Sequence, residues 1–298
     1  MTGGTVLPER RHDHTFWRHR PDVDFPPRSI TALEDYAGGE RLCLVITQTS
    51  LPAAAQKRLL AAWCERLPSL SQVKYLWFQS KVTQEMLDAA CAMPGLEGLY
   101  IKWSAIRSLE RLPQLEKLRQ LFIGGAPSVT SIAPLGRMAH LTWLETENLK
   151  AVSDFSPLAS LTNLVGLGVT GSMWSQQPID TLRPFGKLTA LEWLGVSAAS
   201  DGSLRPLEPL GRLKWLGLPN RYPVEELAWL STRLPHTECR FFQPYEDLTA
   251  RGFTCPKCKK QTVALMSGKG GKFLCLACDR EKVDRHVRAF RALQDELR

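Results

Sequence analysis

The sequence predicts an α/β solenoid, in which short parallel strands stack side by side along one curved sheet. The six-residue pattern Leu-x-x-Leu-x-Ile/Val/Leu, or a close variant of it, recurs seven times between residues 73 and 218. Successive copies start 22 to 27 residues apart, within the range of about 20–29 residues that strand-forming repeats of this kind have. Segments containing Pro-Leu separate several copies, as at Pro134-Leu135 and Pro157-Leu158.

The seven copies begin at Val73, Leu96, Leu118, Leu141, Leu164, Leu191 and Leu213. One unit is too short to bury its own apolar face, so its first, fourth and sixth residues must stack on those of its neighbours. Side chains alternate across a strand, and the third and fifth residues therefore point to the opposite, concave surface. We expect a leucine-rich-repeat horseshoe with a parallel concave sheet.

The remaining elements are expected from composition and apolar spacing. Residues 1–30 are rich in charge, histidine and proline, and they predict an irregular N-terminal arm. Residues 42–46 predict a strand, and 53–67 and 83–93 predict amphipathic helices, so 31–95 are expected to form helix-bearing first repeats. We assign 96–245 to the leucine-rich-repeat solenoid and 251–298 to a zinc finger with a C-terminal helix.

One repeat carries a family resemblance. The stretch Ser153-Asp-Phe-Ser-Pro-Leu-Ala-Ser-Leu-Thr-Asn-Leu-Val165, which continues into a strand at Val169, resembles the repeats of internalin-type leucine-rich proteins. The resemblance covers about residues 96–218 and implies the fold, which hosts adaptors, receptors and regulators alike. Those proteins have asparagine three residues past the sixth position, where this chain has Ala126 and Leu149. Other groups must satisfy the backbone there.

Net charge and the lengths of the apolar runs limit the classes of protein to which this chain could belong. The net charge is +8, and residues 251–298 carry twelve Lys/Arg and five Asp/Glu, so 12 − 5 = +7 belongs to the tail. No apolar run approaches the roughly 18 residues that predict a membrane span. The N-terminus has no apolar core of a secretory signal. We expect a soluble, cytoplasmic protein with reduced thiols.

Four of the eight cysteines form the pattern C-x2-C-x16-C-x2-C, at Cys255, Cys258, Cys275 and Cys278. Each C-x2-C turn can aim two thiolates at one ion, and two turns complete a tetrahedron with Zn–S bonds of about 2.3 Å. Four protein ligands leave no open position for water. The sequence therefore predicts a structural Zn²⁺ site rather than a catalytic one.

The segment Ser267-Gly-Lys-Gly-Gly-Lys-Phe-Leu-Cys275-Leu-Ala-Cys278, with the helical run after it, resembles a treble-clef finger of the GATA type. The resemblance covers about residues 253–298 and implies a hairpin after the first cysteine pair and a helix starting at the second. The helix mixes acidic and basic residues, which is typical of a solvated face. The candidate nucleic-acid contacts are Lys257, Lys259, Lys260, Lys269 and Lys272.

Lys269 lies within Gly268-Lys-Gly-Gly271, a composition that suggests a phosphate-cradling loop. The P-loop motif G-x4-G-K-[ST] is absent from the sequence, so we predict a hairpin tip instead.

Aromatic residues occupy the third and fifth positions of the repeats, which should line the concave surface. With one carboxylate among them, the candidate partner-binding residues there are Trp77, Tyr100, Phe122, Trp143, Glu145, Trp193 and Trp215. Three glycines at the fifth position predict a trough with tryptophan walls. The 27-residue unit inserts a segment with Trp174, a further candidate contact.

Exposed aromatic clusters usually mark interfaces, so we predict a protein or peptide partner on this face. The alternative is that the N-terminal arm, with Phe16, Trp17 and Phe25, or the zinc module folds over the trough.

The sequence contains no H-E-x-x-H motif, no G-x-G-x-x-G after a strand and no local Ser/His/Asp signature. We therefore expect a non-enzymatic recognition scaffold or adaptor. One alternative is a nucleic-acid-associated regulator that uses the basic finger. Another is an inhibitor or immunity-type protein that blocks an enzyme with its concave face.

Overall fold

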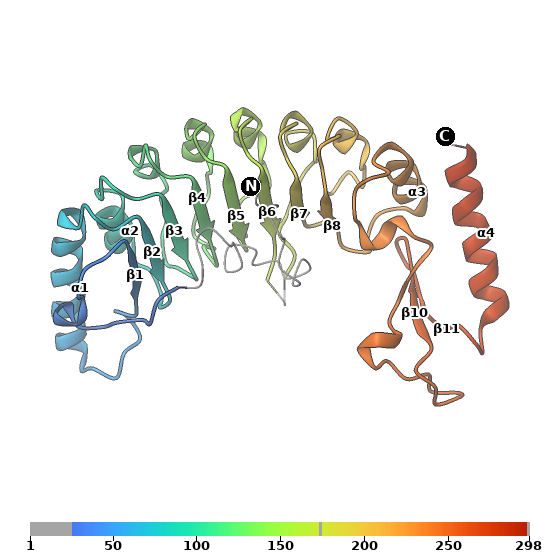
Figure 1. Ribbon diagram of the computed structural model, residues 1–298, viewed down its shortest axis with the longest axis horizontal. Helices are drawn as coiled ribbons and strands as arrows, with labels where there is room; N and C mark the ends of the chain where they lie inside the picture. The colour runs from blue at the N-terminus through green and yellow to red at the C-terminus, as the bar shows by residue number, and fades with distance from the viewer. Residues whose placement is uncertain (1–25, 173–174, 297–298) are drawn as a thin grey trace, which may run out of the picture.

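The computed structural model describes residues 26–172 and 175–296 and confirms the α/β solenoid (Figure 1). Eight strands lie in one sheet in chain order, and every neighbouring pair is parallel. The strands are β1 (Arg41–Leu44), β2 (Tyr75–Phe78), β3 (Gly98–Ile101), β4 (Gln120–Ile123), β5 (Trp143–Glu147), β6 (Gly166–Thr170), β7 (Trp193–Val196) and β8 (Trp215–Gly217).

Helical segments line the outer side of the arc (Figure 1). The first units carry true helices, α1 (Ala53–Arg66) and α2 (Gln84–Ala90). Thr83 caps α2, because its hydroxyl accepts a hydrogen bond from the Met86 N–H at 3.3 Å. Later units have only short 3₁₀ turns, such as Ala133–Arg137 and Ser156–Ser160, each with proline in its first turn. Proline fits there because the first turn of a helix has no intrahelical use for its N–H.

The core is a stack of equivalent leucines that face the outer, helical layer. The fourth residues of the hexads pair in register across the sheet and are at most 1% exposed: Leu76, Leu99, Leu121, Leu144, Leu167, Leu194 and Leu216. Burying one such side chain contributes about 1.5–3 kcal/mol, so the seven together contribute on the order of 10–20 kcal/mol to folding.

Both outer strands of the sheet are paired. On the β1 side, Ile30 donates its N–H to Cys43 O at 2.9 Å and accepts from Val45 N at 3.0 Å. On the β8 side, Glu238 accepts from Leu216 N at 2.9 Å and donates to Lys214 O at 2.9 Å. These short pairings occupy backbone groups that would otherwise invite another strand.

Gln177 satisfies the backbone where internalin-type repeats have asparagine. Its Oε1 accepts from Leu149 N at 2.7 Å, and its Nε2 donates to the carbonyls of Leu149 and Val152 at 3.0 and 2.7 Å. The side chain is 1% exposed. The insertion in the longest repeat thus supplies a buried amide to the preceding turn.

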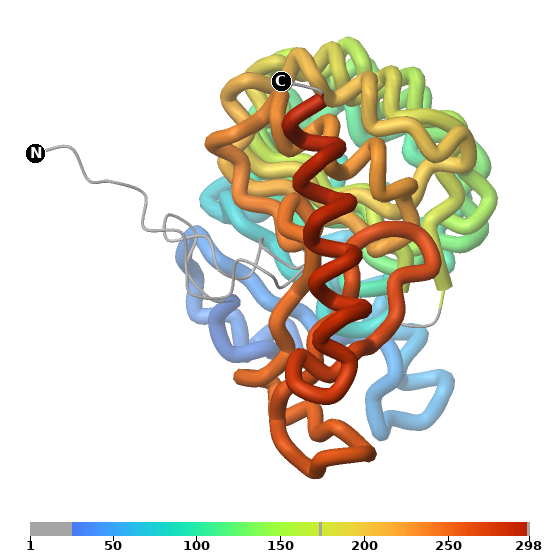
Figure 2. Tube along the Cα trace, turned by 90° about the vertical axis from the view of Figure 1, so that its right-hand side faces the viewer, coloured from blue at the N-terminus to red at the C-terminus, as the bar shows by residue number. Residues whose placement is uncertain are grey.

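A small C-terminal unit follows helix α3 (Val224–Arg233) and closes the end of the solenoid (Figure 2). It contains the antiparallel strands β9 (Tyr245–Asp247), β10 (Val263–Met266) and β11 (Phe273–Cys275), in the order β11-β10-β9, and helix α4 (Arg280–Glu296). β9 lies before residue 251, where we placed the start of the finger.

Helix α4 packs on α3 and inserts Phe290, which is fully buried, into the core of the solenoid. Beside it, Gln294 Nε2 donates to Ser231 Oγ at 2.7 Å. The C-terminal unit is therefore joined to the repeats by shared core as well as by chain. Among the described residues, no helix is long and apolar enough to cross a membrane.

Candidate functional site

The four tail cysteines converge as their spacing predicts. Their sulfur atoms all lie within 4.8 Å of one another, and the Sγ atoms of Cys258 and Cys275 are 3.7 Å apart. A tetrahedron with metal–sulfur bonds of about 2.3 Å has sulfur–sulfur edges of about 3.8 Å. All four thiols are free of disulfides. The arrangement is compatible with one metal ion held by four thiolates.

Hydrogen bonds from a backbone N–H and a hydroxyl favour the ionised form of Cys275. Cys275 Sγ receives the backbone N–H of Cys278 at 3.4 Å and the hydroxyl of Thr262 at 3.1 Å. These donors lower the pKa of Cys275 to about 6, the Cys278 N–H contributing most. Neighbouring cysteine side chains, foremost Cys258, raise the pKa of Cys278 to about 12. Four thiolates so close together repel one another. A bound cation would reduce this repulsion and allow all four to ionise.

Two residues that sequence reasoning passed over organise this cluster. Asp279 connects its two halves, because one carboxylate oxygen accepts from Cys275 N at 3.2 Å and the other from Lys257 Nζ at 3.0 Å. Thr262 lies at the start of the hairpin and supplies the hydroxyl to Cys275. Both residues lie near the cysteines in sequence. The spacing of the cysteines alone does not indicate which of the nearby residues contact the cluster.

The local folds around the cysteines match the predicted order of knuckle, hairpin and helix. Cys255 N donates to Lys260 O at 2.8 Å and Lys259 N donates to Cys255 O at 2.9 Å, which closes the first turn. Lys259 has a φ of 62°, a left-handed conformation that glycine adopts more readily. The hairpin of β10 and β11 follows, and Cys278 lies two residues before the first residue of α4.

The concave aromatic residues lie on the face opposite the leucine core, as alternation predicts. They form two groups apart from that core. The first aromatic cluster consists of Cys43, Trp77, Tyr100 and Phe122, with Tyr75 against it. The tryptophan cluster consists of Trp143, Trp193 and Trp215. Tyr100 and Phe122 stack with their centroids 4.5 Å apart.

The tryptophan rings lie flat over the glycines instead of standing beside them as walls. A Cβ added to Gly166 would come 2.2 Å from Trp143 Cζ3, and one added to Gly217 would come 2.3 Å from Trp215 Cη2. Both distances are too short for any side chain. The glycines therefore provide the space in which the rings lie against the backbone.

Glu145 stands between the two clusters. Its Oε1 accepts a hydrogen bond from Trp143 Nε1 at 2.7 Å. On the neighbouring strands it is paired with Phe122 and Gly168, and it is 2% exposed. The concave face thus has one buried carboxylate in an aromatic setting, which is where a cationic group is favoured.

The exposure of these rings differs from the expectation. We expected water-facing side chains, whereas the six aromatic rings of the two clusters are between 1% and 4% exposed. Stacking along the sheet and contact with the glycine backbone hide part of each ring. Trp174, and the arm residues Phe16, Trp17 and Phe25, lie outside the described residues.

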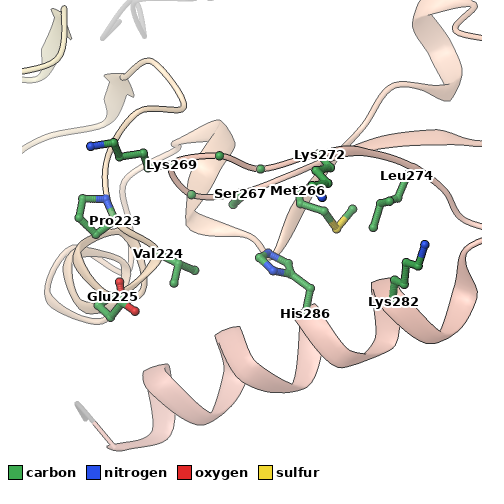
Figure 3. Close-up of a pocket in the computed structure, with 13 residues that line it drawn as sticks. Pro223, Val224, Glu225, Met266, Ser267, Lys269, Lys272, Leu274, Lys282 and His286 are labelled. Atoms are coloured by element: carbon green, nitrogen blue, oxygen red, sulfur yellow. The ribbon is translucent and has the colours of Figure 1, made fainter.

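The candidate nucleic-acid lysines divide into two groups. Lys257, Lys259 and Lys260 belong to the first cysteine turn, and Lys257 is paired with Asp279. Lys269 and Lys272 line a hollow between the start of α3, the turn after β10 and α4 (Figure 3).

The turn at Gly268 is not a phosphate cradle, because three of its backbone N–H groups already have acceptors within the protein. Gly268 N donates to Asn220 Oδ1 at 2.7 Å, and Lys269 N donates to Tyr222 O at 2.7 Å. Gly271 N donates to Gly268 O at 2.8 Å. The tip binds the solenoid instead, in agreement with the predicted hairpin.

No family model matches the sequence, and no curated protein matches it. Several solved leucine-rich-repeat structures do resemble the fold. An internalin (InlF) from Listeria monocytogenes is 21% identical, over 57% of this chain and 54% of its own, with a TM-score of 0.43. Internalin C2 from the same organism is 18% identical, over 51% of this chain and 66% of its own, with a TM-score of 0.41.

A leucine-rich-repeat protein from Leptospira interrogans is 14% identical, over 67% of this chain and 60% of its own, with a TM-score of 0.39. The chain thus spans about half the length of the first internalin. At these identities the likeness concerns the fold alone.

Proposed function

We propose that this protein is a non-enzymatic recognition scaffold that binds a protein or peptide on the concave face of its solenoid. The observation that carries the proposal is the tryptophan cluster spread over a glycine floor. Trp193 is tilted against Trp143, with ring centroids 5.4 Å apart, and is stacked on Trp215 at 4.9 Å. Tryptophan clusters of this kind are frequent binding hot spots.

The chemistry of the face favours a partner segment with a basic side chain. A guanidinium or ammonium group beside Glu145 would meet its carboxylate and, at the same time, the faces of aromatic rings. The six aromatic rings are at most 4% exposed, so a partner that binds them has to reach into the face. We therefore expect an extended segment or loop that enters the face, rather than a flat surface laid on it.

We further propose that the four-cysteine cluster, Cys255, Cys258, Cys275 and Cys278, holds one structural Zn²⁺. Four thiolates favour zinc and close its coordination sphere, so the ion would fix geometry and would not activate water. Its place between the first turn, the hairpin and α4 supports this role, because one ion would join all three. The thiolates also favour a reducing compartment such as the cytoplasm.

The experiment is affinity capture from native lysate with nuclease treatment. It compares the wild type with Trp193→Ala/Trp215→Ala, with Glu145→Gln, and with a control, Trp103→Ala. Trp103 is 40% exposed and belongs to neither cluster. A protein lost with the first two variants and kept with the control supports the proposal. Capture that persists in a folded Trp193→Ala/Trp215→Ala protein contradicts it.

Two further arms separate the alternatives. Deletion of residues 1–25 tests whether the chain's own N-terminal segment competes for the face, in which case the deletion strengthens capture. If the captured protein is an enzyme, its activity in the presence of saturating scaffold distinguishes an inhibitor from an adaptor.

A further inference from the structure

Two hollows of the C-terminal unit have two lining residues in common, and we consider them together as one groove. The first has a volume of about 600 Å³ and lies between the start of α3, the turn after β10 and α4 (Figure 3). The second has a volume of about 570 Å³ and lies over the first cysteine turn and β11. Leu274 and Lys282 line both. Together the two linings include the start of α3 on one side and the first cysteine turn on the other.

The half nearer the solenoid is cationic. Lys269, Lys272 and Lys282 line it against a single carboxylate, that of Glu225. Among the described residues, no carboxylate lies within 4.0 Å of Lys269 or Lys272. Lys282 shares Asp279 with Lys257 at 3.8 Å. Most of this positive charge is therefore available to an anion.

The half nearer the cysteine tip is aromatic and exposed. Phe253 and Phe273 are 47% and 60% exposed, and their rings stack with centroids 6.1 Å apart and planes 15° apart. In the described part of the chain only two other large apolar side chains, Leu51 and Trp103, are comparably exposed. Two exposed phenylalanines on one small unit form an apolar patch, and covering it with a ligand would be favourable because apolar surface is removed from water.

We propose that this groove binds single-stranded nucleic acid. A base would stack on Phe273 or Phe253, and the phosphates would follow Leu274 toward Lys282, Lys272 and Lys269. Aromatic faces combined with a basic track are what unpaired strands need, because every base has a face that can stack. The charge of the unit agrees, since residues 251–298 carry +7, and one Zn²⁺ with four thiolates would leave +5.

A strand is favoured over a duplex for two reasons. Bases inside a duplex cannot reach a phenylalanine face without leaving the stack. Helix α4, the element that could enter a groove of DNA, has mixed charge, and its Arg280 already lies 3.7 Å from Asp284. The phosphate contacts would come from lysine side chains, because the N–H groups of Gly268, Lys269 and Gly271 are already bonded within the protein. Binding should accordingly depend strongly on salt.

The test is fluorescence anisotropy of the full, metal-loaded chain with labelled dT12, rU12 and a 12-base-pair duplex. The variants are Phe273→Ala, Phe253→Ala and Lys269→Ala/Lys272→Ala. Their controls are Trp103→Ala, which removes an exposed aromatic ring, and Lys150→Ala/Lys187→Ala, which removes two exposed charges from the solenoid. Thermal unfolding of each protein verifies that the variants are folded.

We expect both single strands to bind more tightly than the duplex. Phe273→Ala should weaken them about tenfold, since stacking on an aromatic ring contributes about 1–3 kcal/mol per base. The lysine pair should flatten the slope of log K against log salt by about 1.4, at about 0.7 per phosphate contact. The ratio of dT12 to rU12 affinity tells whether DNA or RNA is preferred.

Several results would overturn the proposal. These are no binding of either strand at 50 mM salt with 100 µM protein, tighter binding of the duplex, and equal losses in the variants and their controls. Unchanged affinity in a folded Phe253→Ala/Phe273→Ala protein would equally contradict it. Because the concave residues are untouched in every variant, these outcomes leave the proposed protein partner unaffected.

Discussion

The indole rings of Trp193 and Trp215 stack across neighbouring strands, with centroids 4.9 Å apart and planes inclined by only 6°. Their Cα atoms are paired in register on β7 and β8, and the glycine two residues further along each strand leaves room for the ring. The absence of a Cβ at Gly217 leaves space for the Trp215 ring against the backbone. The tryptophan cluster and its glycines therefore act as one structural unit.

Gly217→Ala should destabilise the protein by about 1–3 kcal/mol, because the new Cβ would lie 2.3 Å from the Trp215 ring and force it off the sheet. The measurement is the free energy of urea unfolding. Gly211→Ala is the matched control, since a Cβ there meets nothing within 4 Å. Equal effects of Gly217→Ala and Gly211→Ala would mean that the Trp215 ring can move to another position without loss of stability.

Gln177→Leu should cost at least about 2 kcal/mol. It leaves Leu149 N and two buried carbonyls without the amide that now bonds them. Gln176→Leu, the same change at the exposed residue just before it, should have little effect. Both are compared by urea unfolding, and a small loss in Gln177→Leu would show that water replaces the amide.

Removal of the metal should loosen more than the tail. Cys258→Ser should lose the bound ion, measured as metal per chain, whereas Cys64→Ser, a free cysteine outside the cluster, should retain it. Since Phe290 of α4 is buried in the solenoid core, amide exchange should then rise in α3 as well as in α4. A rise confined to residues 253–279 would contradict this coupling.

Lys259→Gly should stabilise the first cysteine turn. Glycine adopts a φ of 62° without the strain that a side chain causes, and we expect a gain of about 0.5–1 kcal/mol. Lys260→Ala removes the same charge without that relief and serves as the comparison. Metal affinity, measured by competition with a chelating dye, should rise only in Lys259→Gly.

The sequence was sufficient to predict the sheet but not the way its surfaces are covered. The leucine hexads determine which residues stack, because no other arrangement buries a row such as Leu121, Leu144 and Leu167. The cysteine spacing likewise predicts convergence, since two short turns can satisfy it. Alternation also predicts which face Trp143 occupies. It does not predict that the ring lies flat over Gly166, which depends on contacts between strands.

The sequence patterns did not predict contacts between segments that are far apart in the chain. The apolar spacing of α4 indicates a buried side, but nothing in it says that Phe290 enters the core of the repeats. Gln177 lies in the insertion of the 27-residue unit, which has no equivalent position in the other repeats. Its hydrogen bonds to Leu149 join residues 28 apart in the sequence. The cysteine spacing does not single out Asp279, whose carboxylate links two halves of the cysteine cluster.

The pairing of Ile30 and Glu238 with the outer strands gives the concave face a fixed length. Eight strands are separated by seven intervals, and at about 4.8 Å each the face measures about 34 Å across. An extended peptide advances about 3.4 Å per residue, so about ten residues would cross it from one end to the other. A partner segment of the proposed kind that lay along the whole face would therefore be limited in length by the ends of the sheet at Ile30 and Glu238.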